Sequence, residues 1–297
     1  MEKIKLPKKF IVTADWHLRS TVPSCLDMSE TEWIYVQQSA LNAIENIAIE
    51  NKLDVFVVGD LFHSYKTTSF GIIQMVQNLA VHLYSYGLSL YVLFGNHDLK
   101  FHSSENVDIS AVGILLKSVN IYPISRFDNV SAPNFDEDDV ECEYMFKHTL
   151  CLPKKDFAFS NVEYVYPEKL LSDFKKCNFF FTGDYHRNFV HRSLDDRYVI
   201  NSGCLTKQAS DFEDYETGVY IVDLESCEIK WCPVNIEQKF VKNGSISKVD
   251  KSIEDFVSGI KKESVTLDFI GTLRNELDGQ KKDVKEKVEE WIENIGQ

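Results

Sequence analysis

The sequence has 297 residues, of which 44% are hydrophobic and 26% charged, and its formal net charge is −14. This length suffices for one large domain, or for one domain with a smaller companion. No apolar run approaches the roughly 18–20 residues of a membrane span, and the first residues lack the apolar core of a signal peptide. The composition argues against a membrane protein, and the acidic charge argues against binding of nucleic acid through a broad basic face.

Seven cysteines without a Cys-x-x-Cys pair indicate free thiols in a reducing compartment. We therefore expect a soluble intracellular protein, cytoplasmic or, if the source is eukaryotic, nuclear, with no membrane partner. Part of the negative charge is concentrated in the run 136–143, which is typical of a solvated loop. Attraction of a polyanion would then depend on bound cations, a local patch or a partner protein.

Apolar runs predict three strands in the first part of the chain, over residues 9–14, 54–58 and 88–94. Between them, apolar residues recur at helical spacing. The first helix starts at the capping box Ser29-Glu-Thr-Glu32, and the second spans about 69–86 and ends at Gly87. This alternation of strands and helices predicts parallel strands joined by right-handed crossovers.

The next part contains more strands than helices. Helices are predicted over 109–116 and, after Pro167, over 168–175. Strands are predicted over 143–147 and 179–182, near Val190, and over 198–201, 218–223 and 228–233. Together these elements predict an α/β first domain, residues 1–234, in which two sheets pack face to face with helices outside.

A small second domain is predicted over residues 235–297. A strand at 239–241 precedes a Gly/Ser link, and a short helix opens at Ser252. A strand over 265–270 and a long charged helix over 273–295 follow. We interpret this segment as a small α+β unit docked on the first domain.

Polar side chains follow each of the three early strands. They are Asp15 and His17 after the first, Asp60 after the second, and Asn96, His97 and Asp98 after the third. Because the carboxyl ends of neighbouring parallel strands meet at one edge of a sheet, where ligands bind in open α/β sheets, we expect these groups to converge on a metal. Hydrolysis of a phosphodiester needs an activated water and neutralised phosphoryl oxygens, which two metal ions provide together.

These residues resemble the calcineurin-like metallophosphoesterases. The resemblance rests on Asp15-x-His17, Gly59-Asp60-x-x-His63, Gly95-Asn-His-Asp98, the strand-end His148 and Gly-x-Tyr-His186. Within that superfamily, Gly-Asp-Leu-Phe-His is similar to the SbcD-type nuclease subunit of double-strand-break repair complexes and their tailed-phage recombination counterparts. The resemblance continues through 198–206 and 218–223, and the Gly-Asp-x-Val-Asp-Arg-Gly stretch of the protein phosphatases is absent. It implies a four-layer α-β-β-α sandwich with a small C-terminal α+β capping domain.

The resemblance also implies two divalent metal ions, with Mn²⁺ expected and Mg²⁺ as the alternative. Carried over residue by residue, it places around one ion Asp15, His17, Asp60 and His186. Around the other it places Asp60, Asn96, His148 and position 184. At Asp184 the sequence departs from the family, which usually has histidine there. The carboxylate is either an oxygen ligand or the mark of a weakened second site.

The same resemblance gives three further residues catalytic roles. His97 would be the general acid that protonates the leaving oxygen, with Asp98 orienting it, and His63 would position the scissile phosphate. Three functions stay open. The first is a Mn²⁺-dependent DNA exo/endonuclease that homodimerises and works with an SMC-like ATPase in recombination or repair. The second is a phosphoesterase of small substrates, and the third is a catalytically weakened scaffold for the ATPase and DNA.

Overall fold

The computed structural model describes residues 3–66, 69–133, 140–153 and 163–241. The chain divides into two compact units, Met1–Phe240 and Val241–Gln297. Nearly all of the predicted capping domain, and part of the acidic run 136–143, lies outside the described residues. In the described part, no helix is both long and apolar enough to span a membrane. All seven cysteines are free, as expected.

The first unit contains a six-stranded sheet whose central strands are parallel. Its order is β11 (Glu228–Pro233), β10 (Gly218–Asp223), β1 (Lys9–Thr13), β2 (Val55–Val58), β3 (Leu90–Leu93) and β4 (Ile121–Pro123). β1 to β4 run parallel to one another, and β10 is antiparallel to β1. Val12 pairs with Phe56, and Phe56 pairs with Tyr91, so the carboxyl ends of β1, β2 and β3 lie side by side.

A five-stranded sheet packs against the first. Its order is β5 (Val130–Ser131), β6 (Tyr144–His148), β7 (Phe179–Gly183), β9 (Tyr198–Asn201) and β8 (Phe189–Arg192). β5, β6, β7 and β9 are parallel, and β8 is an antiparallel edge strand. The predicted strands near Val190 and over 198–201 therefore pair as a hairpin.

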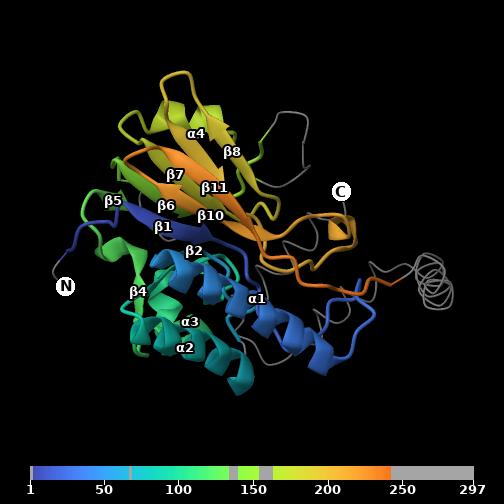
Figure 1. Cartoon of the computed structure of the whole chain (residues 1–297). Helices are drawn as coiled ribbons and strands as arrows, with labels where there is room; N and C mark the ends of the chain where they lie inside the picture. Colours follow the sequence, from blue (N-terminus) through green and yellow to red (C-terminus); the bar gives the residue numbers. More distant parts are fainter. Residues whose placement is uncertain (1–2, 67–68, 134–139, 154–162, 242–297) are drawn as a thin grey trace, which may run out of the picture. The chain divides into compact units, whose positions relative to one another are not determined.

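Helices cover the outer faces of both sheets (Figure 1). They are α1 (Glu30–Asn51), α2 (Phe70–Ser85) and α3 (Ala111–Leu115) on the first sheet, and α4 (Pro167–Asp173) on the second. Short 3₁₀ turns connect the elements at η1 (Lys100–His102), η2 (Ser104–Ile109), η3 (Ile124–Arg126) and η4 (Ser210–Phe212). The predicted α-β-β-α order of layers is confirmed for the first domain.

An aromatic layer fills the space between the sheets. Phe10 and Phe56 from the first sheet have ring centroids 4.4 Å apart, and so do Phe146 and Phe181 from the second. All four side chains are fully buried. Burying a side chain of this size stabilises the fold by about 1.5–3 kcal/mol. This layer supports the strand ends that carry the candidate site.

Helix α1 begins as the sequence predicts. The Ser29 hydroxyl accepts from the Glu32 N–H at 3.2 Å, and the Ser29 N–H donates to Glu32 Oε2 at 2.8 Å. Each bond satisfies an N–H that helix geometry leaves unpaired. Farther along the chain two elements differ from expectation. Residues before Ala111 form the turn η2 instead of α-helix, and the predicted strand at 239–241 is a single antiparallel bridge between Phe240 and Leu26.

Candidate metal centre

The candidate site lies where strand ends of both sheets meet. Asp15 and His17 follow β1, Asp60 follows β2, Asn96, His97 and Asp98 follow β3, His148 ends β6, and Asp184 and His186 follow β7. The loops after β1 and β2 stay paired beyond the strands, because the Asp15 N–H donates to Gly59 O at 3.1 Å and the His17 N–H to Asp60 O at 2.9 Å. The structure thus brings the predicted residues into one cluster.

Four of these residues have left-handed backbone conformations. The φ angles are 51° at Asp15, 43° at His17, 53° at Asp60 and 77° at Asp184. Such a conformation costs a residue other than glycine about 1–3 kcal/mol, and strain of this kind gathers at functional sites. Asp15, His17 and Asp60 lie in the paired loops after β1 and β2, whose hydrogen bonds hold these conformations.

Asp60 occupies the centre of the cluster and is fully buried. Its Oδ2 lies 3.3 Å from His148 Nε2 and 3.5 Å from His17 Nε2. Its Oδ1 accepts from the His97 N–H at 2.9 Å. One carboxylate therefore faces imidazoles from two different sheets.

Two groups of candidate ligands share Asp15. In the first, Asp15, His17 and His186 have ligand atoms within 4.8 Å of one another, and the two histidine Nε2 atoms are 3.0 Å apart. In the second, the same limit holds for Asp15, Asp60 and His148. The first group contains three of the four residues assigned to one ion. The second adds Asp15 to Asp60 and His148, which were assigned to the other.

The second group is completed by Asn96. His148 Nδ1 lies 2.8 Å from Val58 O and donates to it, which leaves the lone pair of Nε2 directed into the site. The Asn96 amide faces this nitrogen and both Asp60 oxygens, and with its own nitrogen turned toward them it donates at 3.2, 3.1 and 3.3 Å. Rotated by half a turn, the same amide presents its oxygen, so amide, carboxylate and imidazole can all offer lone pairs to a cation at this point. The donor set therefore fits a divalent metal.

The buried charges favour the same conclusion. Burial lowers the pKa of His148, but the carboxylates of Asp60 and Asp15 outweigh it and the net shift is upward. Burial raises the pKa of Asp60, but His148 outweighs this and lowers it. The pKa of Asp15 lies well above its ordinary value, because burial raises it by more than the attraction of His148 lowers it. Asp15 and Asp60 are thus two buried carboxylates that repel each other, and a bound cation would relieve that repulsion.

His97 and His63 stand beside the ligand cluster. His97 Nδ1 lies 2.8 Å from His63 O and donates to it, so Nε2 is the nitrogen left to act on a substrate. The ring centroids of His97 and His17 are 4.9 Å apart, and those of His63 and His97 are 5.5 Å apart. Both predicted histidines therefore reach the site.

The contacts of Asp98 differ from the expectation that it orients His97. Its buried carboxylate accepts from the N–H groups of Leu61 at 3.2 Å, Phe62 at 3.0 Å and Gly95 at 3.0 Å. These bonds tie the loop after β2 to the loop after β3. Asp98 therefore holds the two loops together, and the group that orients the His97 ring is the His63 carbonyl.

Asp184 reaches the site first through its backbone. Its N–H donates to both Asp15 oxygens at 3.1 Å. Its carboxylate is half-buried and acts electrostatically on Asp15 and His148, but it is not a member of the groups whose ligand atoms lie within 4.8 Å. The predicted metal-binding role of the side chain stays a prediction.

Two glycines leave no space for a side chain. A Cβ on Gly59 would lie 2.1 Å from His148 Nδ1, and a Cβ on Gly95 would lie 2.0 Å from Asp60 Oδ1. Gly59 also has a φ of +86°, which favours glycine. The glycines of both motifs are therefore needed because candidate ligands pack directly against their backbone.

Arg19, which the sequence motifs did not predict, also lies beside the site. Its Nη1 donates to His63 Nε2 at 2.9 Å. Burial, followed by the positive charge of Arg19, lowers the pKa of His63 to about 4, so the imidazole is neutral at pH 7. In the sequence, the only signal for Arg19 is its position two residues after His17, because the contact with His63 arises from the pairing of the loops after β1 and β2.

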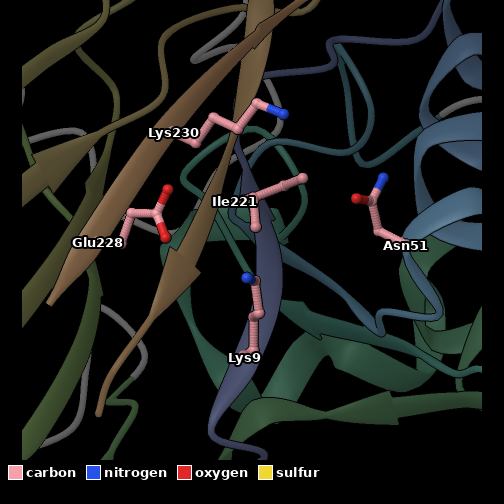
Figure 2. Close-up of a pocket in the computed structure, with 5 residues that line it drawn as sticks. All are labelled: Lys9, Asn51, Ile221, Glu228 and Lys230. Atoms are coloured by element: carbon pink, nitrogen blue, oxygen red, sulfur yellow. The ribbon is translucent and has the colours of Figure 1, made fainter. Parts of the chain in front are cut away.

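A separate pocket lies near the start of β1 (Figure 2). It has a volume of about 150 Å³ and is lined by Lys9, Asn51, Ile221, Glu228 and Lys230. Because Lys9 begins β1 whereas Asp15 follows its end, the pocket and the candidate ligands lie at opposite ends of that strand. None of its lining residues belongs to the groups of candidate ligands found in the described residues.

Comparison with known proteins identifies the family. The model of the calcineurin-like phosphoesterases matches residues 8–191, which include every candidate ligand. The chain belongs to this family. It is accordingly a metallophosphoesterase, a hydrolase with a metal-binding site, and the fold expected from the motifs is that of the family. A search of curated proteins gave no match.

Several solved structures are similar to the calcineurin-like chain. A protein of Thermus thermophilus is 11% identical, with a TM-score of 0.42, 76% of this chain covered and 99% of the other. A dimetal phosphatase from Danio rerio is 10% identical, with a TM-score of 0.47 and coverage of 77% and 97%. The nuclease MPE of Pseudomonas putida is 14% identical, with a TM-score of 0.34 and coverage of 74% and 86%.

Proposed function

We propose that the chain is a metal-dependent phosphodiesterase that cleaves DNA as an exo- or endonuclease. The observation that carries the proposal is the position of Asp60, whose Oδ2 lies within 3.5 Å of imidazoles from two sheets. The extension from phosphoester to DNA rests on the resemblance of Gly59-Asp-Leu-Phe-His63 to SbcD-type nuclease subunits. It is supported by a cation, Arg19, beside the site.

Two metal ions fit the donor set in two groups joined by Asp60. Asp15, His17 and His186 are the residues proposed for one ion, and Asn96, His148 and Asp184 for the other. When bound, such ions activate water and neutralise charge on the phosphoryl oxygens. Carboxylate and amide oxygens among the ligands favour Mn²⁺ or Mg²⁺, and we propose Mn²⁺ as the working ion.

His97 is proposed to protonate the leaving oxygen. Its Nδ1 is engaged by His63 O, so Nε2 is the atom that carries the transferable proton. A general acid positioned in this way contributes about 10²–10⁴-fold to the rate. His63, neutral at pH 7, is proposed to help position the scissile phosphate beside it.

The proposed partners are an SMC-like ATPase and a second copy of the chain in a recombination or repair complex. The dimer is supported by an apolar stripe on α2 and α3: Phe70, Val81, Tyr84 and Ile114 are each at least 49% exposed. Gln77 of α2 donates to Ser118, just beyond α3, at 2.8 Å, so the two helices that carry these residues lie side by side. An exposed apolar stripe of this kind suits a self-complementary interface.

Incubation of the full chain with linear duplex DNA, single-stranded DNA and bis(4-nitrophenyl) phosphate in Mn²⁺ tests the function. We expect cleavage of the diester and of at least one DNA, loss of both in EDTA, and little action on 4-nitrophenyl phosphate. Cleavage of the diester without any DNA cleavage, also when an SMC-like ATPase is added, would contradict the nuclease assignment. Absence of all hydrolysis would favour the scaffold.

A further inference from the structure

Arg19 is placed beside the site by the paired loops after β1 and β2. The Leu18 N–H donates to Leu61 O at 2.9 Å, and the His63 N–H donates to Leu18 O at 3.2 Å. This pairing brings the Arg19 guanidinium against the His63 ring, where Nη1 donates to Nε2 at 2.9 Å. His63 in turn lies next to His17 and His97. Arg19 is therefore one residue removed from the candidate ligands.

Two side chains of α1 hold the backbone of Arg19 through hydrogen bonds. The Arg19 N–H donates to Gln37 Oε1 at 2.9 Å, and Arg19 O accepts from Gln37 Nε2 at 2.9 Å and from Trp33 Nε1 at 3.0 Å. Gln37 is fully buried on the inner face of the helix. A buried amide is stable where its hydrogen bonds are satisfied, and the Gln37 amide bonds both the N–H and the carbonyl of Arg19. The backbone of Arg19 is therefore held in one position.

The charge of Arg19 has no anionic partner among the described residues. Burial lowers the pKa of Arg19, and Cys25 raises it by a smaller amount. No carboxylate contributes to the shift of this pKa. The Nε–H is buried without a hydrogen-bond partner. Half-buried guanidinium groups normally pair with carboxylates or phosphates, for which their planar fork is suited. This one faces a neutral imidazole and retains an unused donor.

We propose that Arg19 binds the phosphate that flanks the scissile phosphodiester in a nucleic-acid strand. The inference rests on the proposed function. The scissile phosphate would lie against the ligand cluster and His97. Arg19 contacts the His63 ring and lies one residue farther from the ligands. A second anion in this position exists in a polynucleotide and is missing from an isolated phosphodiester. Arg19 therefore selects strands over small diesters, in a protein whose overall charge is negative.

Arg19→Ala and Arg19→Lys test this with two substrates in Mn²⁺: a fluorescent oligonucleotide and bis(4-nitrophenyl) phosphate, which has no flanking phosphate. For Arg19→Ala we expect the KM of the oligonucleotide to rise roughly tenfold, with kcat and the rate on the small diester within about twofold of wild type. Arg19→Lys should recover part of the loss, because it keeps the charge without the fork.

Binding measured without turnover gives a second readout. In EDTA, the slope of log Kd for the oligonucleotide against log salt concentration should fall by about 0.7 for a single strand in Arg19→Ala, because one phosphate contact is lost. Arg192→Ala is the matched control. Arg192 pairs with Asp196 at 2.6 Å, and its partner on β9 is Tyr198, the first residue of that strand, so it lies at the end of β8 away from the site. Its removal should leave the slope unchanged.

The outcomes separate the inference from the proposed function. Equal losses on both substrates would place Arg19 on the scissile phosphate and overturn the flanking-phosphate assignment, while DNA cleavage by the wild type would still stand. An unchanged KM and salt slope, with wild-type thermal stability, would overturn it as well. Failure of the wild type to cleave or bind DNA would overturn the proposed function, and the flanking-phosphate assignment with it.

Discussion

The His97 ring is oriented by the backbone of His63, since Nδ1 of His97 donates to His63 O across 2.8 Å. The contact joins the loop after β3 to the loop after β2. The side chain of His63 points instead toward Arg19. His63 therefore has two contacts at the site. Its carbonyl orients His97, the proposed general acid, and its ring accepts a hydrogen bond from Arg19.

His97→Ala should lower kcat on DNA by about 10²–10⁴-fold, because the leaving oxygen of a nucleotide needs a proton. On bis(4-nitrophenyl) phosphate, whose leaving group is stable without protonation, the loss should be less than about tenfold. Steady-state kinetics on both substrates measure the difference.

The control for this variant is His82→Ala. His82 lies on α2, its side chain is 56% exposed, and it pairs with Glu45. Its removal should change neither rate. If His97→Ala slows both substrates equally, the ring has a role other than proton donation.

Asp60→Asn should abolish metal binding to at least one of the two groups. The carboxylate lies between His17 and His148, and a neutral amide removes the charge that both proposed ions share. Titration with Mn²⁺ should raise the melting temperature of the wild type, since saturation at 100 times Kd stabilises by about 2.7 kcal/mol. Calorimetry of the variant should show less of this stabilisation than the wild type does. An unchanged melting shift, or activity within tenfold of wild type, would reject Asp60 as the shared ligand.

The strands that carry the site were predictable because buried runs such as 54–58 end at glycine followed by aspartate. The later His148 and His186 came from the resemblance, which supplied the order of motifs along the chain. Arg19 and Asp98 show what was not predictable. The role of each depends on which loops lie side by side after the strands end, and that pairing cannot be predicted from the local sequence.

Asp98 predicts a pH effect on the metal-free protein. Its burial, followed by repulsion from Asp60, raises its folded-state pKa to about 7 from the ordinary value of 3.8. Between these values the unfolded chain has lost the proton that the folded chain retains, so stability falls as pH rises. The slope is about 1.4 kcal/mol per pH unit and levels off above about pH 7. The stability of the folded state is therefore reduced where Asp98 is ionised.

Urea unfolding of wild type and Asp98→Asn in EDTA, from pH 5 to 8, measures this contribution. Asparagine loses part of the acceptor set for Leu61, Phe62 and Gly95, which costs about 1–3 kcal/mol, but it does not titrate. The deficit of the variant should therefore shrink as pH rises toward 7. A deficit that stays constant or grows over this range would contradict the raised pKa. The exposed Asp214→Asn provides a control that should follow the wild-type curve.

Phe70→Asp should convert the proposed dimer to a monomer. The Phe70 side chain is 85% exposed at the start of the α2 stripe, so the fold does not depend on it. Sedimentation velocity of the full chain over a range of concentrations measures the assembly state. Tyr35→Asp, at a 72% exposed residue on α1, tests whether any surface aromatic has the same effect. A wild type that stays monomeric at high concentration would reject the dimer.

Variants of Asp184 test whether the site holds one ion or two. Its N–H anchors Asp15 in any variant that keeps the left-handed backbone, so Asp184→Asn and Asp184→Ala isolate the side chain. If the carboxylate is a ligand, Asp184→Ala should reduce Mn²⁺ stoichiometry from two to one, and calorimetry with metal analysis of dialysed protein measures this.

Asp184→His restores the residue that the family usually has at this position. With an imidazole nitrogen in place of a carboxylate oxygen, the second site should keep Mn²⁺ and gain affinity for Zn²⁺, because imidazole suits the softer ion. The net charge of the ligand set also becomes less negative by one, which should lower the affinity for any dication at long range. For Zn²⁺ we expect the preference for imidazole to outweigh the lost negative charge, so its affinity should rise. For Mg²⁺ we expect the lost charge to have the larger effect, so its affinity should fall and the ratio of Zn²⁺ to Mg²⁺ affinity should rise. If Asp184→Ala leaves the stoichiometry at one and Asp184→His raises it to two, the aspartate is not a ligand and the second site is already weakened in the wild type.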